Sequence, residues 1–118
     1  MDFKISFYID NKGKSPVEEF LISLIKGNRI LVVNTKNAIE KLRNRSYHRE
    51  PLSKYIEPDL WELRVKSSTN ILRIIYTFRK GQVIIMLHGF VKKKQKLSWG
   101  DLEIAKKRLK ELKQRGIL

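Results

Sequence analysis

Cationic and imidazole side chains lie in three neighbouring segments in the second half of the chain. Arg64 and Lys66 belong to the first segment, Arg73 to the second and His88 to the third. Guanidinium groups bind phosphate oxygens through paired hydrogen bonds, and a neutral imidazole can take up a proton near pH 7. These residue types suit a site that binds an anion and also transfers a proton.

The three segments alternate like β-strands, so their pairing decides which side chains share a face. With Ser67–Asn70 as one turn and Lys80-Gly81 as the next, Arg64 lies opposite Arg73, and Arg73 lies opposite His88. Side chains directly opposite each other point to the same face. The other face is then almost wholly apolar and is expected under the helices: Trp61, Leu63, Val65, Leu72, Ile74, Tyr76, Phe78, Val83, Ile85, Leu87 and Val91.

Two interpretations of the cationic row remain open. Like charges directly opposite each other destabilise a sheet, so the row favours a binding site for phosphates. Alternatively, Arg64 pairs with Glu62 or Glu57, and the row is an ordinary solvated sheet face.

Phe90 and a lysine run extend the predicted cationic face. Phe90 is either a core or rim residue or a platform on which a base can stack. Lys92, Lys93, Lys94 and Lys96 are either a solvated loop or a contact for an RNA backbone, which we expect because they follow His88 and Phe90 directly.

Four strands and three helices are expected to position these residues. Ser15-Pro16-Val17-Glu18 and Ser98-Trp99-Gly100-Asp101 are typical of helix starts, and Gly27 and Gly116 of helix ends. Short turns between the later strands favour an antiparallel sheet, and the single apolar stripe of each helix favours helices packed on one face. The expected α+β domain, 1–118, has the order β-α-α-β-β-β-α, over these segments: Phe3–Ile9, Ser15–Gly27, Arg29–Asn44, Leu60–Lys66, Ile71–Arg79, Gln82–Lys92 and Ser98–Gly116, with Tyr47–Asp59 as a loop or a short edge strand.

Charge and composition narrow the classes of partner. The 118 residues carry a net charge of +14, and residues 60–118 hold 15 basic against 4 acidic side chains. Such a surplus favours a polyanion, most often nucleic acid, over an acidic protein or an anionic membrane surface. The absence of cysteine excludes disulfides and thiolate zinc sites, and two histidines make a histidine-built metal site improbable. No apolar run reaches the ~18–20 residues of a membrane span, and the start of the chain lacks a signal-peptide core.

Four motifs, in this order, carry a family resemblance: Ser15–Leu21 (SPVEEFL), Leu60–Arg64 (LWELR), Arg73–Tyr76 (RIIY) and Leu87–Lys93 (LHGFVKK). Together they resemble the phage-derived HigB-like branch of the RelE/ParE toxin superfamily. The resemblance implies a small RelE-like fold and a cytoplasmic toxin that a cognate helix-turn-helix antitoxin neutralises. It also implies ribosome-dependent cleavage of mRNA, without metal or cofactor.

The resemblance extends to Arg64, Arg73, the lysine run and His88. The chemistry of such a cleavage suggests the hypothesis that Arg64 and Arg73 stabilise the phosphorane and that His88, or a lysine of 92–93 such as Lys93, transfers protons. The cationic sheet face adds further residues that are expected to bind RNA: Lys66, Phe90, Lys92, Lys94 and Lys96. Cleavage would proceed through the RNA's own 2′-hydroxyl, which needs no protein nucleophile. Two other functions remain open: a ParE-like inhibitor of DNA gyrase on the same scaffold, and a non-catalytic module that binds nucleic acid.

Overall fold

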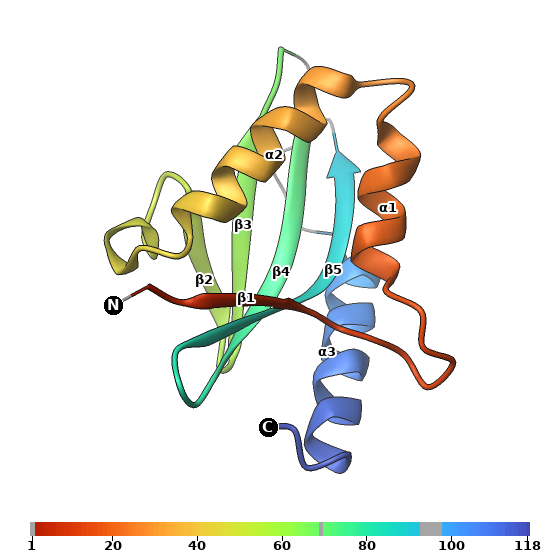
Figure 1. The fold of residues 1–118 in the computed structure, drawn as a ribbon, viewed down its shortest axis with the longest axis vertical. Coiled ribbons are helices and arrows are strands. Elements are labelled where there is room, and N and C mark those ends of the chain that lie inside the picture. The colour runs from red at the N-terminus through yellow and green to blue at the C-terminus, as the bar shows by residue number, and fades with distance from the viewer. Residues whose placement is uncertain (1, 69, 93–97) are drawn as a thin grey trace.

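A computed structural model describes residues 2–68, 70–92 and 98–118. Its strands form one five-stranded sheet in the order β1-β5-β4-β3-β2, with three helices around it (Figure 1). The α+β class is confirmed, with one strand more than expected. The elements are β1 (Lys4–Phe7), α1 (Pro16–Leu24), α2 (Arg29–Lys41), the 3-10 helix η1 (Arg45–Tyr47), β2 (Ser53–Glu57), β3 (Leu60–Lys66), β4 (Ile71–Arg79), β5 (Val83–Lys92) and α3 (Trp99–Gln114).

Helices α1 and α2 cover one face of the sheet. Helix α1 begins at the expected proline, and the Ser15 hydroxyl donates to the Glu18 carboxylate at 2.8 Å. The start of α2 is set by Asn28, whose side chain accepts from the Leu31 amide at 3.3 Å. Side chains from both helices enter a core shared with one face of the strands, among them Val17, Phe20, Leu31, Ala38, Leu42, Leu63, Leu72, Ile74, Tyr76, Ile84 and Met86.

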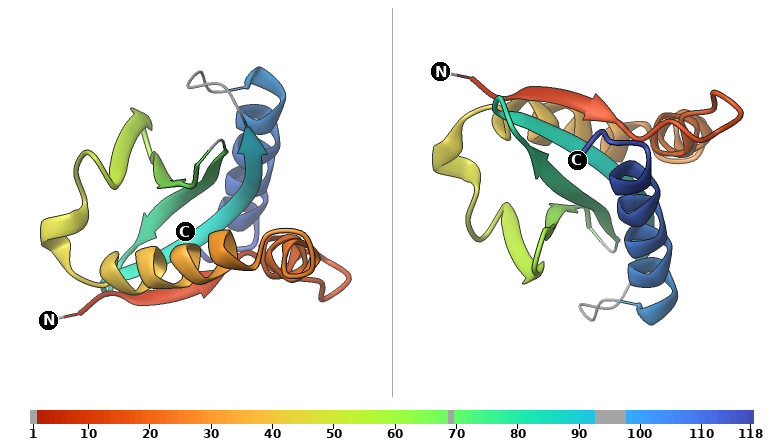
Figure 2. Two further views of the ribbon diagram at one scale, coloured as in Figure 1. Left: turned by 90° about the horizontal axis from the view of Figure 1, so that it is seen from above. Right: turned by 90° about the horizontal axis from the view of Figure 1, so that it is seen from below.

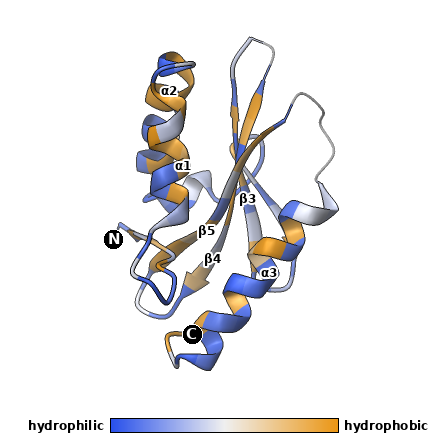
Figure 3. Ribbon diagram, turned by 90° about the vertical axis from the view of Figure 1, so that its right-hand side faces the viewer, coloured by the Kyte–Doolittle hydropathy of each residue, from blue (hydrophilic) through white to orange (hydrophobic). Residues whose placement is uncertain are grey.

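Helix α3 lies on the opposite face of the sheet, so the expectation of helices on one face only is wrong. Figures 2 and 3 show the sheet between the α1–α2 pair and α3. The stripe Leu102, Ala105, Leu109 and Leu112 packs against Ile75, Ile85, Leu87 and Phe90. The central strands β4 and β5 carry apolar side chains on both faces, and such strands need a cover on each side.

The expectation of a purely antiparallel sheet is also wrong. Strand β1 pairs with β5 in parallel, with Lys4 beside Val83 and Phe7 beside Met86. The other neighbouring strands pair antiparallel. A pairing between the first and the last strand depends on how the intervening helices pack, and local turn signals contain no information about it.

The turn between β4 and β5 has three residues where two were expected, which corrects the predicted register. Gly81 and Gln82 have φ angles of 86° and 58°, so the turn continues through Gln82 and Arg79 pairs with Val83. A bulge next to Ile75 then shifts the register once more. Each one-residue shift moves side chains to the other face. In the part of β5 between the turn and the bulge, Ile84 and Met86 therefore face α1 and α2. Ile85 and Leu87, which were expected there, face α3.

The segment left open as a loop or an edge strand contains β2. Ser53 pairs with Leu63 of β3, and the pairing ends near Glu57 and Leu60. Beyond Leu63, the Arg64 amide still donates to the carbonyl of Leu52 at 2.9 Å. The Ser53 amide donates to the Arg49 carbonyl at 3.0 Å, so the chain before Leu52 turns back on itself and the pairing stops before Val65 and Lys66.

Candidate functional site

Three rows of side chains cross β3, β4 and β5 on the face that carries α3. The predicted pairing of Arg64 with Arg73 is confirmed. The predicted pairing of Arg73 with His88 is wrong, because the longer turn and the bulge place Phe90 opposite Arg73 and place His88 two pairs along, opposite Ile75. The rows are Glu62–Ile75–His88, Arg64–Arg73–Phe90 and Lys66–Ile71–Lys92.

Arg73 is the most buried cation of these rows. Its side chain is 2% exposed, and Nη1 donates to both oxygens of Glu62, at 3.1 and 3.3 Å. Buried charges need such pairing, because leaving a carboxylate alone away from water is costly. A side chain that is 2% exposed offers little surface to an RNA phosphate, and the expected catalytic contact of Arg73 stays a prediction.

Arg64 shares the same carboxylate but lies closer to solvent. Its Nε is 3.3 Å from Glu62 Oε1, which matches the alternative in which Arg64 pairs with Glu62, and its side chain is 16% exposed. Glu57 instead pairs with Lys106 at 3.7 Å. A second carboxylate, that of Glu50, lies 3.8 Å from Arg64 Nη1 and is 66% exposed. Because exposed pairs of this length contribute little, an incoming phosphate can replace Glu50 at Arg64.

Both ring nitrogens of His88 contact helix α3. Nε2 lies 2.7 Å from Asp101 Oδ1, and Nδ1 lies 3.4 Å from Arg108 Nη1. Arginine nitrogens only donate, so Nδ1 is the acceptor and Nε2 carries the proton that it donates to Asp101. Arg108 Nη1 also donates to the Leu87 carbonyl at 2.8 Å, and burial lowers the pKa of Arg108. His88 therefore joins β5 to the first turn of α3.

Phe90 belongs to the core on the α3 side. The residue is 7% exposed, and its ring stacks on His88 with centroids 5.5 Å apart. This matches the core alternative and leaves little of the ring for a base. Lys92 lies beside it, with Nζ 5.9 Å from the ring and 3.6 Å from Asp101 Oδ2.

Two of the lysines that were expected to bind RNA lie at strand ends, and three lie outside the described residues. Lys66 is exposed at the end of β3, and Lys92 is partly exposed at the end of β5. Lys93, Lys94 and Lys96 lie outside the described residues, and their expected roles stay predictions.

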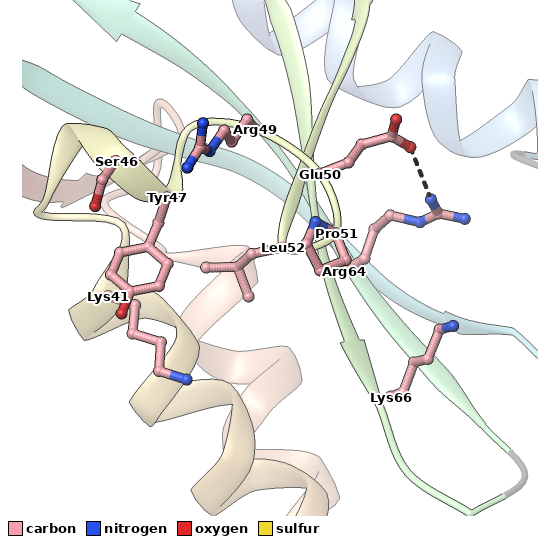
Figure 4. A pocket seen from close by; sticks show the side chains of 9 residues that line it. All are labelled: Lys41, Ser46, Tyr47, Arg49, Glu50, Pro51, Leu52, Arg64 and Lys66. Atoms are coloured by element: carbon pink, nitrogen blue, oxygen red, sulfur yellow. Dashed lines mark ion pairs between the residues drawn. The ribbon is translucent and has the colours of Figure 1, made fainter.

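A pocket beside Arg64 contains residues that the sequence analysis missed. It has a volume of about 800 Å³, and its lining includes Lys41, Tyr47, Arg49, Arg64 and Lys66. Figure 4 shows these side chains around Leu52. The signal is present in the sequence, because residues 43–49 hold three arginines and a tyrosine. The sequence analysis assigned this stretch to the end of a helix and to a loop or short edge strand, and it assigned no binding role to these side chains.

The described residues contain no group of three or more His, Cys, Asp or Glu side chains that could hold a metal ion. Among their helices, none has both the length and the apolar character that crossing a bilayer requires.

Comparison with known proteins identifies the family. No curated protein matches the chain. Residues 21–110 match the family model described as phage derived protein Gp49-like (DUF891), a span that includes α2, the whole β2–β5 region and most of α3. Gp49-like proteins are a toxin-like family of toxin–antitoxin systems, related to RelE-type toxins. Because the match covers well over half of the 118 residues, the chain belongs to the phage derived protein Gp49-like family.

Proposed function

We propose that this protein is the toxin of a toxin–antitoxin system, of the HigB-like type, and that it cleaves mRNA on the ribosome in the cytoplasm. The observation that carries the proposal is Arg64, a partly exposed guanidinium on a cationic strand, whose outer carboxylate partner is weakly held. Lys66 and Lys92 on the same sheet face add positive charge for an RNA backbone. Family membership supports the toxin class.

The proposed chemistry uses the RNA's own nucleophile. The 2′-oxygen attacks the adjacent phosphorus, and the bond from phosphorus to the 5′-oxygen breaks, which leaves a 2′,3′-cyclic phosphate and a 5′-hydroxyl. A base takes the 2′-proton and an acid protonates the leaving oxygen. Arg64 stabilises the crowded phosphorane, whose charge exceeds that of the ground state.

His88 and Lys93 are the candidates for proton transfer. The His88 ring is 13% exposed and its proton on Nε2 is held by Asp101, so transfer to RNA requires this hydrogen bond to open. Arg73 then has a positioning role, because it holds the Glu62 carboxylate against which Arg64 rests.

Few residues of this chain are placed to transfer protons, so we expect the ribosome to supply the orientation of the substrate. Correct placement of reacting groups can account for a large share of a rate enhancement. Naked RNA is therefore expected to be cleaved slowly, and ribosome-bound mRNA rapidly.

Primer extension on mRNA tests the proposal, using purified protein with and without ribosomes. Wild-type protein is expected to produce cleavage ends only when ribosomes are present. Arg64→Ala is expected to lower the rate about 10²- to 10³-fold, the typical effect of losing one contact to a developing oxyanion. Arg79→Ala, which removes an exposed arginine at the far end of β4, is the matched control and should cleave like wild type.

Other outcomes would reject parts of the proposal. Blocked DNA supercoiling by gyrase, with mRNA left intact, would establish the ParE-like alternative. Salt-dependent RNA binding without any cleavage ends would establish a binding module. A helix-turn-helix protein encoded next to this chain is expected to abolish growth arrest when both are expressed, and failure to do so would reject the antitoxin partnership.

A further inference from the structure

The pocket beside Arg64 has the size of a nucleotide site. It lies between the end of α2, η1, the loop that follows and the free end of β3, and its volume is about 800 Å³. Pockets for small ligands usually measure about 300–1,000 Å³. One nucleotide with its phosphate therefore fits the available space.

Positive charge dominates the lining. Lys41, Arg49, Arg64 and Lys66 surround it, and Glu50 is its single carboxylate. Within the described part of the chain, Lys41, Arg49 and Lys66 make no ion pair, and all three are exposed. Cations without a carboxylate partner around a pocket favour an anionic ligand. Phosphate groups can bind both the two lysines and Arg49.

An aromatic ring and an apolar floor distinguish this pocket from a simple phosphate site. Tyr47 is 40% exposed, and Lys41 Nζ lies 5.8 Å from the centre of its ring. Figure 4 shows Leu52 between Tyr47 on one side and Pro51 on the other. Exposed aromatic rings beside cations bind single-stranded nucleic acid, since every base can stack on them. The combination therefore favours a nucleotide over a bare anion.

The pocket adjoins the proposed cleavage site through Arg64, which lines it and also contacts Glu62. We propose that the pocket binds one nucleotide of single-stranded RNA next to the phosphate at Arg64. Tyr47 stacks the base, while Lys41, Arg49 and Lys66 contact the backbone. This inference rests on the proposed function, because it assigns a subsite to the same RNA.

Binding of a short single-stranded RNA with 2′-O-methyl groups tests the subsite, since this RNA lacks the nucleophile and stays intact. Fluorescence anisotropy is expected to show about tenfold weaker binding by Tyr47→Ala, the loss typical of one stacked base. Tyr47→Phe keeps the ring and should bind like wild type. Tyr55→Ala removes another exposed tyrosine, on β2 and outside the pocket, and is the matched control.

The charged part of the pocket is tested by salt dependence. Lys41→Gln is expected to reduce the slope of log affinity against log salt concentration by about 0.7, the value for one phosphate contact with a single strand. Lys36→Gln removes an exposed lysine from the same helix, outside the pocket, and should leave the slope unchanged. Adenosine monophosphate as a competitor separates a free nucleotide from an RNA strand.

The outcomes separate this inference from the proposed function. If wild-type protein cleaves mRNA on ribosomes while Tyr47→Ala and Lys41→Gln bind and cleave like wild type, the subsite is rejected and the function stands. If the variants lose RNA binding but no protein cleaves mRNA, the subsite stands and the function is rejected. Binding of the mononucleotide without binding of the RNA strand overturns the subsite as an RNA site.

Discussion

The carboxylate of Glu62 accepts two hydrogen bonds from Arg73, at 3.1 and 3.3 Å, while both side chains are at least 97% buried. Arg64 contacts the same carboxylate from the solvent side at 3.3 Å. One acidic side chain thus links an internal arginine to a partly exposed one. Substitutions at these three positions therefore separate stability from activity.

Arg73→Ala is expected to destabilise the protein by about 3–5 kcal/mol, the usual cost of leaving one member of a buried ion pair behind. The double variant Arg73→Met/Glu62→Leu should recover most of this loss, because neither charge then remains buried alone. Urea unfolding of both variants measures the difference. An unchanged urea midpoint for Arg73→Ala would contradict the buried-pair interpretation. The activity of this variant should be compared with that of wild type only after its folded fraction has been measured.

Arg64→Lys keeps the positive charge but loses the planar guanidinium. We expect ribosome-dependent cleavage to fall about tenfold, less than for Arg64→Ala, because a lysine holds a phosphate as a point charge. Its stability should change by less than about 1 kcal/mol, because the lysine keeps a positive charge beside the Glu62 carboxylate and the pair with Glu50 is exposed. Cleavage at the wild-type rate would show that the planar guanidinium is not required at this position.

His88→Gln distinguishes two possible roles of His88, which are proton transfer to RNA and attachment of α3 to β5. Glutamine can still donate to Asp101 but cannot exchange a proton, so cleavage is expected to fall at least about 10²-fold while the fold persists. Asp101→Asn removes the charge from the hydrogen bond and should lower the free energy of unfolding by about 1–3 kcal/mol, with a smaller effect on the rate. Equal rates for the two variants would make His88 a residue that only holds α3 on β5.

Tyr76 gives the fold a dependence on alkaline pH. Burial raises its pKa to about 12, although its hydrogen bond with Ser53 opposes the shift. The raised pKa means that the folded state favours the neutral phenol. The contribution of Tyr76 to the free energy of unfolding is therefore fully present below about pH 10 and is lost as pH rises toward 12. Two pKa units correspond to about 2–3 kcal/mol. Denaturant unfolding across this range should show a steeper loss for wild type than for Tyr76→Phe, and equal curves would contradict it.

Gly89 lies between His88 and Phe90 and contacts helix α1. A methyl group there would lie 2.8 and 2.9 Å from two ring atoms of Phe20. Gly89→Ala is therefore expected to lower the free energy of unfolding by about 1–3 kcal/mol, and adding Phe20→Leu should restore part of it. Gly100→Ala is the control, because its nearest neighbour lies 3.9 Å away. A thermal unfolding midpoint unchanged by Gly89→Ala would show that Phe20 moves aside without cost.

Local signals in the sequence were sufficient for most elements. The helix starts at Pro16 and after Ser98 were predicted from motifs typical of a first turn, and both helices begin where expected, although neither serine side chain caps the backbone. The β3–β4 register was also predicted, because the four-residue turn leaves one consistent pairing. In each case the deciding interactions lie within a few residues of one another, where the order of residue types is informative.

The register between β4 and β5 could not be predicted from such local signals. The third turn residue, Gln82, has a positive φ, and the bulge beside Ile75 has no distinctive residue type, so His88 was expected opposite Arg73. Each one-residue shift moves a side chain to the other face of the sheet, so two shifts together return it to the first face. Arg64, Arg73 and His88 therefore still lie on one side of the sheet.

The amino-acid order by itself determined most of the element types, the cationic bias of residues 60–118 and the face shared by Arg64 and Arg73. Tertiary structure alone decided that α3 covers this face, that Glu62 holds Arg73 inside, and that Tyr47 and Arg49 lie beside Arg64. Burial and ion pairing between distant segments depend on how complete faces fit together in space. Such fits arise from many weak contacts at once, and no short stretch of sequence encodes them.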